Sequence, residues 1–158
     1  MFVLGKKSLD TLVGVDPKLV SVVSRAIQLT QVDFRVNEGV RTMTRQKQLL
    51  KEGKTQTLKS KHIDGQAVDL VALVDNKVNW DASYYIQIAE AVRLAAIELN
   101  IPVRWGGCWL SDLRNYSSSQ VAIDTYKKVR KQQGKSVFLD LVHFELIWYV
   151  KEEKIHKI

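Results

Sequence analysis

Two short stretches of this sequence, 60–69 and 141–144, carry residue types that bind metal ions. The first runs from Ser60 to Asp69 and places His62 in a polar, lysine-rich stretch and Asp69 inside the apolar run 66–73. A buried aspartate without compensation is costly, so it must be neutralised, hydrogen-bonded or bound to a cation. Imidazole and carboxylate groups are common zinc ligands, and a catalytic zinc ion takes three protein ligands and keeps one position open. The pattern therefore calls for a third ligand.

The remaining histidines are His143 and His156. His156 belongs to a charged tail, whereas His143 lies in the apolar stretch 141–144, so His143 is the better candidate. Each residue alone also has a structural explanation, because histidines satisfied within the core and aspartates that cap loops are common. Taken together, His62, Asp69 and His143 predict one metal site.

Hydrophobic periodicity indicates which elements must position these residues. Helical spacing predicts helices over 17–30, 44–52, 83–100 and 118–133, the second with Thr44 as a possible cap. Alternating or dense apolar residues predict strands over 33–38, 66–73, 78–80, 103–105 and 137–149, and 53–61 is predicted to be a loop. The irregular order of helices and strands favours an α+β fold over a doubly wound sheet.

Length and composition are typical of one globular domain. The 158 residues include 46% hydrophobic and 26% charged side chains, and no stretch has the composition of a linker. We expect a single domain over 1–158, with a core from about 8 to 149 and a charged tail over 150–158. The single cysteine, Cys108, excludes an intramolecular disulfide. We expect no signal peptide and no stable membrane insertion, because the apolar runs are too short.

The net charge of +7 favours an anionic partner, which includes nucleic acid, a wall polymer or a membrane surface. The basic clusters lie over 47–61 and 126–135. Lysines at helical spacing usually form a solvated face, so charge alone does not predict a nucleic-acid site.

Four segments, in order, resemble the zinc D-alanyl-D-alanine carboxypeptidase and dipeptidase family, particularly the phage endolysins that act as L-alanyl-D-glutamate peptidases. They are EGVRTMTRQ over 38–46, SKHIDGQAVD over 60–69, RWGGCW over 104–109 and DLVH over 140–143. The opening LVGVDP over 12–17 is also similar, so the resemblance spans about 8–146. The chain departs from the pattern at Thr42, at Cys108 and in the long basic stretch 111–135.

The resemblance implies a compact α+β fold in which a small, mainly antiparallel sheet carries the zinc site and helices surround it. It implies one Zn²⁺ per chain on His62, Asp69 and His143, with Asp140 as general base and Arg41 as electrophilic helper. Residues three apart on a regular strand point to opposite faces, so Asp140 can act with His143 only if it precedes the strand or a bulge intervenes. Glu145 shares the face of His143 and is either a group that orients the ligand or the base itself. Candidate substrate contacts are Ser60, Gln46, Trp105 and Trp109.

Three functions remain open on this basis. The first is an endolysin that hydrolyses the L-alanyl-D-glutamate bond of peptidoglycan stem peptides, acting as a monomer. We expect such an enzyme to stay in the host cytoplasm until a separate membrane-permeabilising protein releases it to the wall. The second is a D-alanyl-D-alanine dipeptidase or carboxypeptidase with the same metal site. The third is a non-catalytic basic module that binds wall polymer or nucleic acid. We favour the enzyme, with stem peptides rather than nucleic acid as its partner, because charge alone does not explain a histidine and an aspartate around one buried strand.

Overall fold

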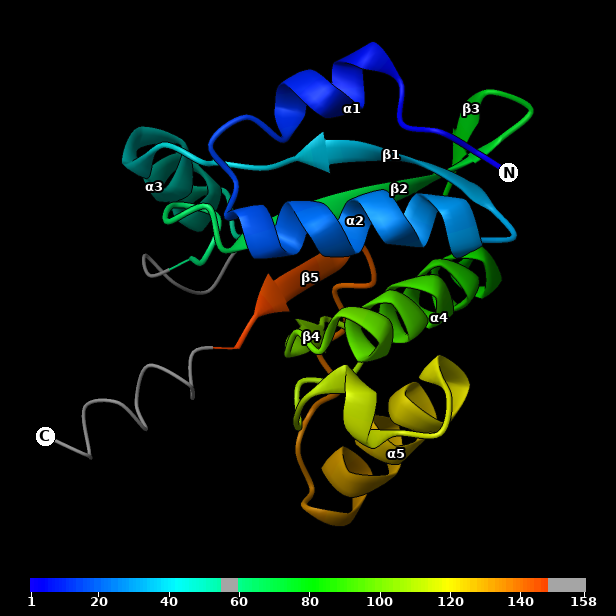
Figure 1. Ribbon diagram of the computed structural model, residues 1–158. Helices are drawn as coiled ribbons and strands as arrows, with labels where there is room; N and C mark the ends of the chain where they lie inside the picture. Colours follow the sequence, from blue (N-terminus) through cyan, green and yellow to red (C-terminus); the bar gives the residue numbers. More distant parts are fainter. Residues whose placement is uncertain (55–59, 148–158) are drawn as a thin grey trace, which may run out of the picture.

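An antiparallel sheet forms the centre of the computed structural model, which describes residues 1–54 and 60–147 (Figure 1). Its strands follow the order β1-β2-β5-β4, and β3 forms a hairpin with β2. The strands are β1 (Asp33–Glu38), β2 (Ala67–Val74), β3 (Lys77–Asn79), β4 (Val103–Trp105) and β5 (His143–Leu146). The hairpin turn contains Asp75 and Asn76, both with positive φ, as a tight two-residue turn requires.

The helices are α1 (Lys6–Thr11), α2 (Pro17–Leu29), α3 (Met43–Lys51), α4 (Ala82–Leu99) and α5 (Ser119–Gln132), with a short 3-10 turn η1 over Leu113–Asn115. Helix α2 starts as its sequence predicts, because the Asp16 carboxylate caps it and Pro17 occupies its first turn. It packs on α4, and both lie in front of the sheet in Figure 1. Helix α5 contacts α4 on the side away from α2. In the described part of the chain, no helix is long and apolar enough to cross a bilayer.

Strand β2 separates the hydrophobic core from the polar face of the sheet. Its side chains Val68, Leu70 and Ala72 belong to the main core cluster and are fully buried. Because side chains alternate along a strand, Asp69 projects from the opposite face. The core cluster also includes apolar residues of α2 and α4, which explains why this face of the sheet is covered by helices.

Strand register aligns polar residues into rows across the sheet. Asp69 lies opposite both Glu38 of β1 and His143 of β5. A register shift between Val36 and Glu38 brings Glu38 into this row. In the neighbouring row, Glu145 of β5 lies opposite Arg104 of β4. Segments far apart in the sequence thus meet on one face.

The α+β class and the antiparallel sheet predicted from the sequence are confirmed, and most elements agree within a residue or two. Three details were wrong or missed. The cap of α3 is Thr42, whose hydroxyl accepts a hydrogen bond from Arg45 N, and not Thr44. Helix α1 had no periodic signal, and its Ser8 is held by a hydrogen bond from Val36 N. The predicted strand 137–149 is far shorter: within the described residues, only 143–146 pair as a strand. The tail 150–158, including His156, lies outside the described residues.

Candidate metal centre and cleft

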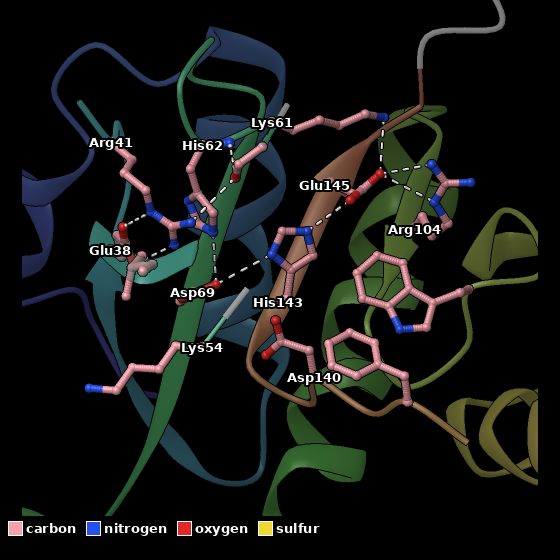
Figure 2. A pocket seen from close by; sticks show the side chains of 14 residues that line it. Glu38, Arg41, Lys54, Lys61, His62, Asp69, Arg104, Asp140, His143 and Glu145 are labelled. Atoms are coloured by element: carbon pink, nitrogen blue, oxygen red, sulfur yellow. Dashed lines mark hydrogen bonds and ion pairs between the residues drawn. The ribbon is translucent and has the colours of Figure 1, made fainter. Parts of the chain in front are cut away.

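A cleft of about 640 Å³ opens on the polar face of the sheet, around β2 and β5 (Figure 2). Its walls come from β1, β2, β4 and β5, from α3, and from the segments before β2 and β5. His62, Asp69, Asp140 and His143 all line it. The cleft thus brings together the residues that the sequence predicted for metal binding and for the general base.

His62, Asp69 and His143 form a group that can hold a metal ion. One ligand atom from each residue lies within 4.8 Å of the others. His62 Nε2 lies 3.0 Å from Asp69 Oδ1, and His143 Nδ1 lies 3.5 Å from the same oxygen. Both imidazoles are buried, and the Asp69 side chain keeps 15% of its surface exposed in the cleft.

The second nitrogen of each imidazole is already engaged. Gly39 O lies 2.9 Å from His62 Nδ1, and a carbonyl oxygen can only accept, so Nδ1 carries the hydrogen. Glu145 Oε1 lies 2.8 Å from His143 Nε2. Each ring therefore turns its remaining nitrogen toward Asp69 Oδ1, which also has only lone pairs when ionised. Two ring nitrogens that face one carboxylate oxygen are suited to a single cation held by all three groups.

The local backbone explains how His62 reaches this position. The loop before β2 turns at Gly65, which has φ of +69°. A Cβ added at Gly65 would lie 2.6 Å from Gly14 O, so the close approach of these two loops requires glycine here. The amide of Arg41 donates to His62 O at 2.9 Å, and the amide of His62 donates to Ser60 Oγ at 3.2 Å.

The electrostatics of the group match its geometry. Burial opposes ionisation of Asp69, but the hydrogen bonds and positive charges of His143 and His62 outweigh it and hold the pKa of Asp69 well below its ordinary value. For His143, burial lowers the pKa, but Asp69 and Glu145 raise it by more, so the pKa is about 9. The metal-free chain therefore carries a protonated His143 beside an ionised Asp69 at neutral pH.

Glu145 connects the metal group to two cations. Its Oε1 bonds to His143, and its Oε2 accepts from Lys61 Nζ at 3.0 Å and from Arg104 Nη2 at 2.9 Å (Figure 2). Burial opposes its ionisation, but His143, Lys61 and Arg104 lower its pKa to about 2. Of the two roles left open for Glu145, the geometry favours orienting His143, because both carboxylate oxygens are occupied.

Asp140 precedes β5 rather than lying within it, which resolves the awkward spacing from His143. It belongs to a turn in which His143 N donates to Asp140 O at 3.1 Å. Gly106 clamps this turn, because its N–H donates to His143 O and its carbonyl accepts from Asp140 N, both at 2.8 Å. A Cβ at Gly106 would lie 2.0 Å from Asp140 O. The Gly-Gly segment after β4 therefore brings Asp140 to the cleft.

The environment of Asp140 favours a proton acceptor of increased basicity. Burial raises its pKa above the ordinary value, and the negative charge of Asp69 adds to this effect. The positive charges of His143, His62 and Arg41 oppose it but do not cancel it. A carboxylate of raised pKa at a metal site has the properties expected of a general base.

Arg41 lies at the opposite end of the cleft from Arg104. Its guanidinium forms a bidentate ion pair with Glu38 and donates to Gln46 Oε1 at 2.7 Å. A longer contact of 3.5 Å joins it to Ser60 Oγ. Burial opposes the charge of Arg41, but Glu38, Asp69 and Asp140 raise its pKa. The alternative role of a surface salt bridge is excluded, because only 9% of this side chain is exposed.

The predicted substrate contacts separate into two groups. Ser60 and Trp109 line the cleft, and the Trp109 ring lies 5.4 Å from that of His143. Gln46 and Trp105 have no exposed surface, so we correct their predicted roles. Gln46 Oε1 accepts a hydrogen bond from Arg41 Nη1. Trp105 stacks on Phe144 in the core and donates to Leu141 O.

Sequence reasoning missed several residues of the cleft: Glu38, Lys54, Lys61, Arg104 and Phe138. Three of them lie within the motifs quoted above, beside residues that were singled out. Their signal was a charged side chain inside an otherwise recognisable segment. Phe138 carried no such signal, because it was assigned to a strand; it stacks on Trp109 instead.

Comparisons with known proteins identify the family of this chain. A sequence model of the family described as phage L-alanyl-D-glutamate peptidase matches residues 1–147. The L-alanyl-D-glutamate peptidase of Escherichia phage T5 is 34% identical over 112 residues, which cover 68% of this chain and 82% of the phage protein. The crystal structure of the Serratia marcescens L-Ala D-Glu endopeptidase ChiX matches with a TM-score of 0.70 and 36% identity, covering 92% of this chain and 90% of that one. This chain therefore belongs to the phage L-alanyl-D-glutamate peptidase family.

Proposed function

We propose that this protein is a zinc-dependent endolysin that hydrolyses the L-alanyl-D-glutamate bond in the stem peptides of bacterial peptidoglycan. The observation that carries the proposal is the convergence of His62, Asp69 and His143 within 4.8 Å, in a cleft that also contains Asp140. Membership of a family of L-alanyl-D-glutamate peptidases supports the choice of bond over the D-alanyl-D-alanine bond.

The donor set fits zinc better than a hard cation. Two imidazole nitrogens and one carboxylate oxygen are typical catalytic zinc ligands, whereas calcium and magnesium take mainly oxygen ligands. The engaged Nδ1 of His62 and Nε2 of His143 leave one nitrogen on each ring for a metal. When bound, zinc supplies a Lewis acid that polarises the scissile carbonyl and makes a water molecule acidic near neutral pH.

Asp140 acts as the general base and then the general acid in this mechanism. Its carboxylate takes a proton from the attacking water and passes it to the nitrogen of the glutamyl residue as the carbon–nitrogen bond breaks. Its raised pKa brings the carboxylate closer to the basicity that this transfer needs. The Gly106 clamp holds Asp140 on the cleft side of the turn, so little reorganisation is required.

Arg41 stabilises the negative charge that develops on the carbonyl oxygen. Its guanidinium carries five N–H donors, and the pair with Glu38, the bond to Gln46 and the longer contact with Ser60 use four of them. The remaining Nη2 donor is available to an oxyanion. Because Glu38 and Gln46 fix the plane of the group, this donor is oriented before substrate binds.

Digestion of purified muropeptides, analysed by mass spectrometry, tests the proposal. We expect products cut after L-alanine, about one zinc per chain, and loss of both cleavage and zinc in His62→Ala with the circular dichroism spectrum preserved. Release of terminal D-alanine would instead identify a D-alanyl-D-alanine peptidase. An active, zinc-free His62→Ala protein would overturn the metal mechanism, and binding to wall polymer without hydrolysis would identify a non-catalytic module.

The route to the substrate is part of the same proposal. We infer that the enzyme acts as a monomer after a separate membrane-permeabilising protein gives it access to the wall. Added to intact Gram-negative cells, it should lyse them only when their outer membrane is permeabilised. Lysis of intact cells by the added protein alone would contradict this route.

A further inference from the structure

The two ends of the cleft differ in charge balance. At one end, Arg41 is matched by Glu38, one cation for one anion. At the other end, Lys61 and Arg104 share the single carboxylate of Glu145. Glu145 also accepts from His143, so its charge is divided among three positive or donating groups. Among the residues that the structure describes, the second end therefore has two cations for one carboxylate.

Of these two cations, which both line the cleft, Arg104 is the more exposed. Its Nε and Nη2 both bond to Glu145 Oε2, at 3.2 and 2.9 Å. Its side chain is 31% exposed, and Figure 2 shows one guanidinium nitrogen that no dashed line joins to a neighbour. Within residues 1–54 and 60–147, no hydrogen bond is made by Arg104 Nη1. Lys61 is less exposed, at 16%, and also donates to Leu146 O.

The chemistry of the proposed substrate offers a match for this group. A glutamyl residue has two carboxyl groups, and only one of them carries the next residue of the stem. The other is a free carboxylate unless the cell wall amidates it. Because the nitrogen of this same residue leaves during hydrolysis, the free carboxylate lies only a few bonds from the reacting carbonyl.

We propose that Arg104 determines substrate specificity by binding the free carboxylate of the glutamyl residue, with Glu145 fixing one edge of its guanidinium. This inference rests on the proposed function and names a contact within it. Arginine is suited to the role, because a guanidinium pinned on one edge still offers donors to a planar carboxylate on another. The enzyme then prefers walls in which this carboxyl is not amidated.

The other cations of the cleft are poorer candidates. Arg41 is matched in charge by Glu38, and the mechanism above assigns its remaining donor to the oxyanion. Lys54 lies at the rim with 65% of its side chain exposed and 3.9 Å from Glu52, so solvent screens its charge. Lys54 therefore serves as a matched control at the opposite wall of the cleft.

A pair of synthetic peptides tests the inference. One is N-acetyl-L-alanyl-D-glutamyl-L-lysine, in which the glutamyl carboxyl that does not carry the lysine is free. The other has a carboxamide in place of that free carboxyl. We expect the zinc-loaded wild type to prefer the acidic peptide by about 10- to 100-fold in kcat/KM, mainly through KM, as expected for one charge-assisted contact. In Arg104→Gln the preference should fall to within about threefold, whereas Lys54→Gln should keep the wild-type ratio.

The outcomes separate this inference from the function on which it rests. If wild type cleaves neither peptide but Zn²⁺ is bound, the proposed function fails. If wild type cleaves both equally well, the function stands and the role of Arg104 is overturned. An Arg104→Gln protein that loses zinc affinity and activity on both peptides alike would show that Arg104 only supports Glu145. Partial recovery of the preference in Arg104→Lys would support a contact through charge.

Discussion

The two halves of the cleft are built by different means. In the half formed by β2, β4 and β5, strand register sets Asp69 opposite His143 and Glu145 opposite Arg104. In the half formed by loops, His62 is held by hydrogen bonds to single backbone groups and by turns that need glycine. The sheet half is thus placed by many cooperative backbone bonds, and the loop half by a few local ones.

This difference affects how each half responds to substitution. A side-chain change in the sheet half leaves the backbone ladder intact, so its effects should be chemical and confined to one contact. A change in the loops alters the only bonds that position a group, so small steric changes should have large effects. The two histidines illustrate the contrast, because Gly39 O fixes His62 and the Glu145 side chain fixes His143.

The largest expected effect is the removal of the base from the loop half. Asp140→Asn keeps the size of the side chain but cannot accept the proton, so kcat should fall about 10²- to 10⁴-fold while zinc content stays unchanged. Muropeptide turnover and metal analysis measure the two quantities. Asp124→Asn on the exposed face of α5 is the matched control and should retain full activity. An active Asp140→Asn enzyme would return the role of base to Glu145.

The next largest effect tests how strictly the loops position that base. In Gly106→Ala the new Cβ would lie 2.0 Å from Asp140 O, which forces the turn to move. A displacement of about 1 Å at a catalytic group can reduce turnover about 100-fold, and we expect a loss of that order together with a lower Tm. Gly5→Ala, where nothing lies within 4 Å, should change neither. Wild-type turnover in Gly106→Ala would show that the clamp is dispensable.

The same contrast explains how much of the molecule could be predicted from its sequence. Asp69 was found because a carboxylate inside an apolar strand demands a partner, and α2 because its cap and proline mark its start. The motif over 60–69 made His62 a candidate ligand beside Asp69. Each of these signals lies within about ten residues of chain, where local chemistry is informative.

What could not be predicted depends on pairing between distant segments. The sequence left two roles open for Glu145, and the choice between them follows from its position opposite Arg104, which only the register of β4 and β5 reveals. The stretch before His143 reads as a strand because it is dense in apolar residues, yet Phe138 packs on Trp109 and the Gly106 clamp bends the chain at Asp140. Gln46 and Trp105 were assigned to the cleft for their chemistry, but burial decided otherwise.

A third, smaller effect tests the sheet half directly. Glu145→Gln keeps the shape of the side chain but removes the charge that holds the His143 ring, and its amide would face Lys61 and Arg104 with donors. Loss of a carboxylate behind a metal-bound histidine typically weakens metal binding about 10- to 100-fold. Competition with a chelator measures the affinity. Glu98→Gln, at a surface pair with Arg25, should leave it unchanged. An unaltered affinity in Glu145→Gln would mean that strand register alone orients His143.

The smallest effect sharpens the comparison through pH. In the metal-free chain, Asp69 and Glu145 raise the pKa of His143 from 6.5 to about 9, so metal must displace a proton from this ring. The apparent zinc affinity should therefore rise by about tenfold per pH unit, and level off above about pH 9. The protonated ring stabilises the metal-free fold fully below its ordinary pKa of 6.5, and this contribution is lost as the pH rises through about 9.

The change in zinc affinity and the change in stability of the metal-free fold both alter the Tm difference between zinc-loaded and metal-free protein in the same direction. As the pH rises from 6.5 toward 9, the metal-free protein loses the stabilisation from protonated His143 while the metal binds more tightly. The gap in Tm between zinc-loaded and metal-free protein should therefore widen over this interval, as measured by scanning calorimetry at fixed free zinc. In Glu145→Gln the ring loses one of the two carboxylates that raise its pKa, so the gap should reach its full width at lower pH. A gap that is independent of pH would mean that His143 carries no proton for zinc to displace, and that the sheet half is already arranged for metal before it binds.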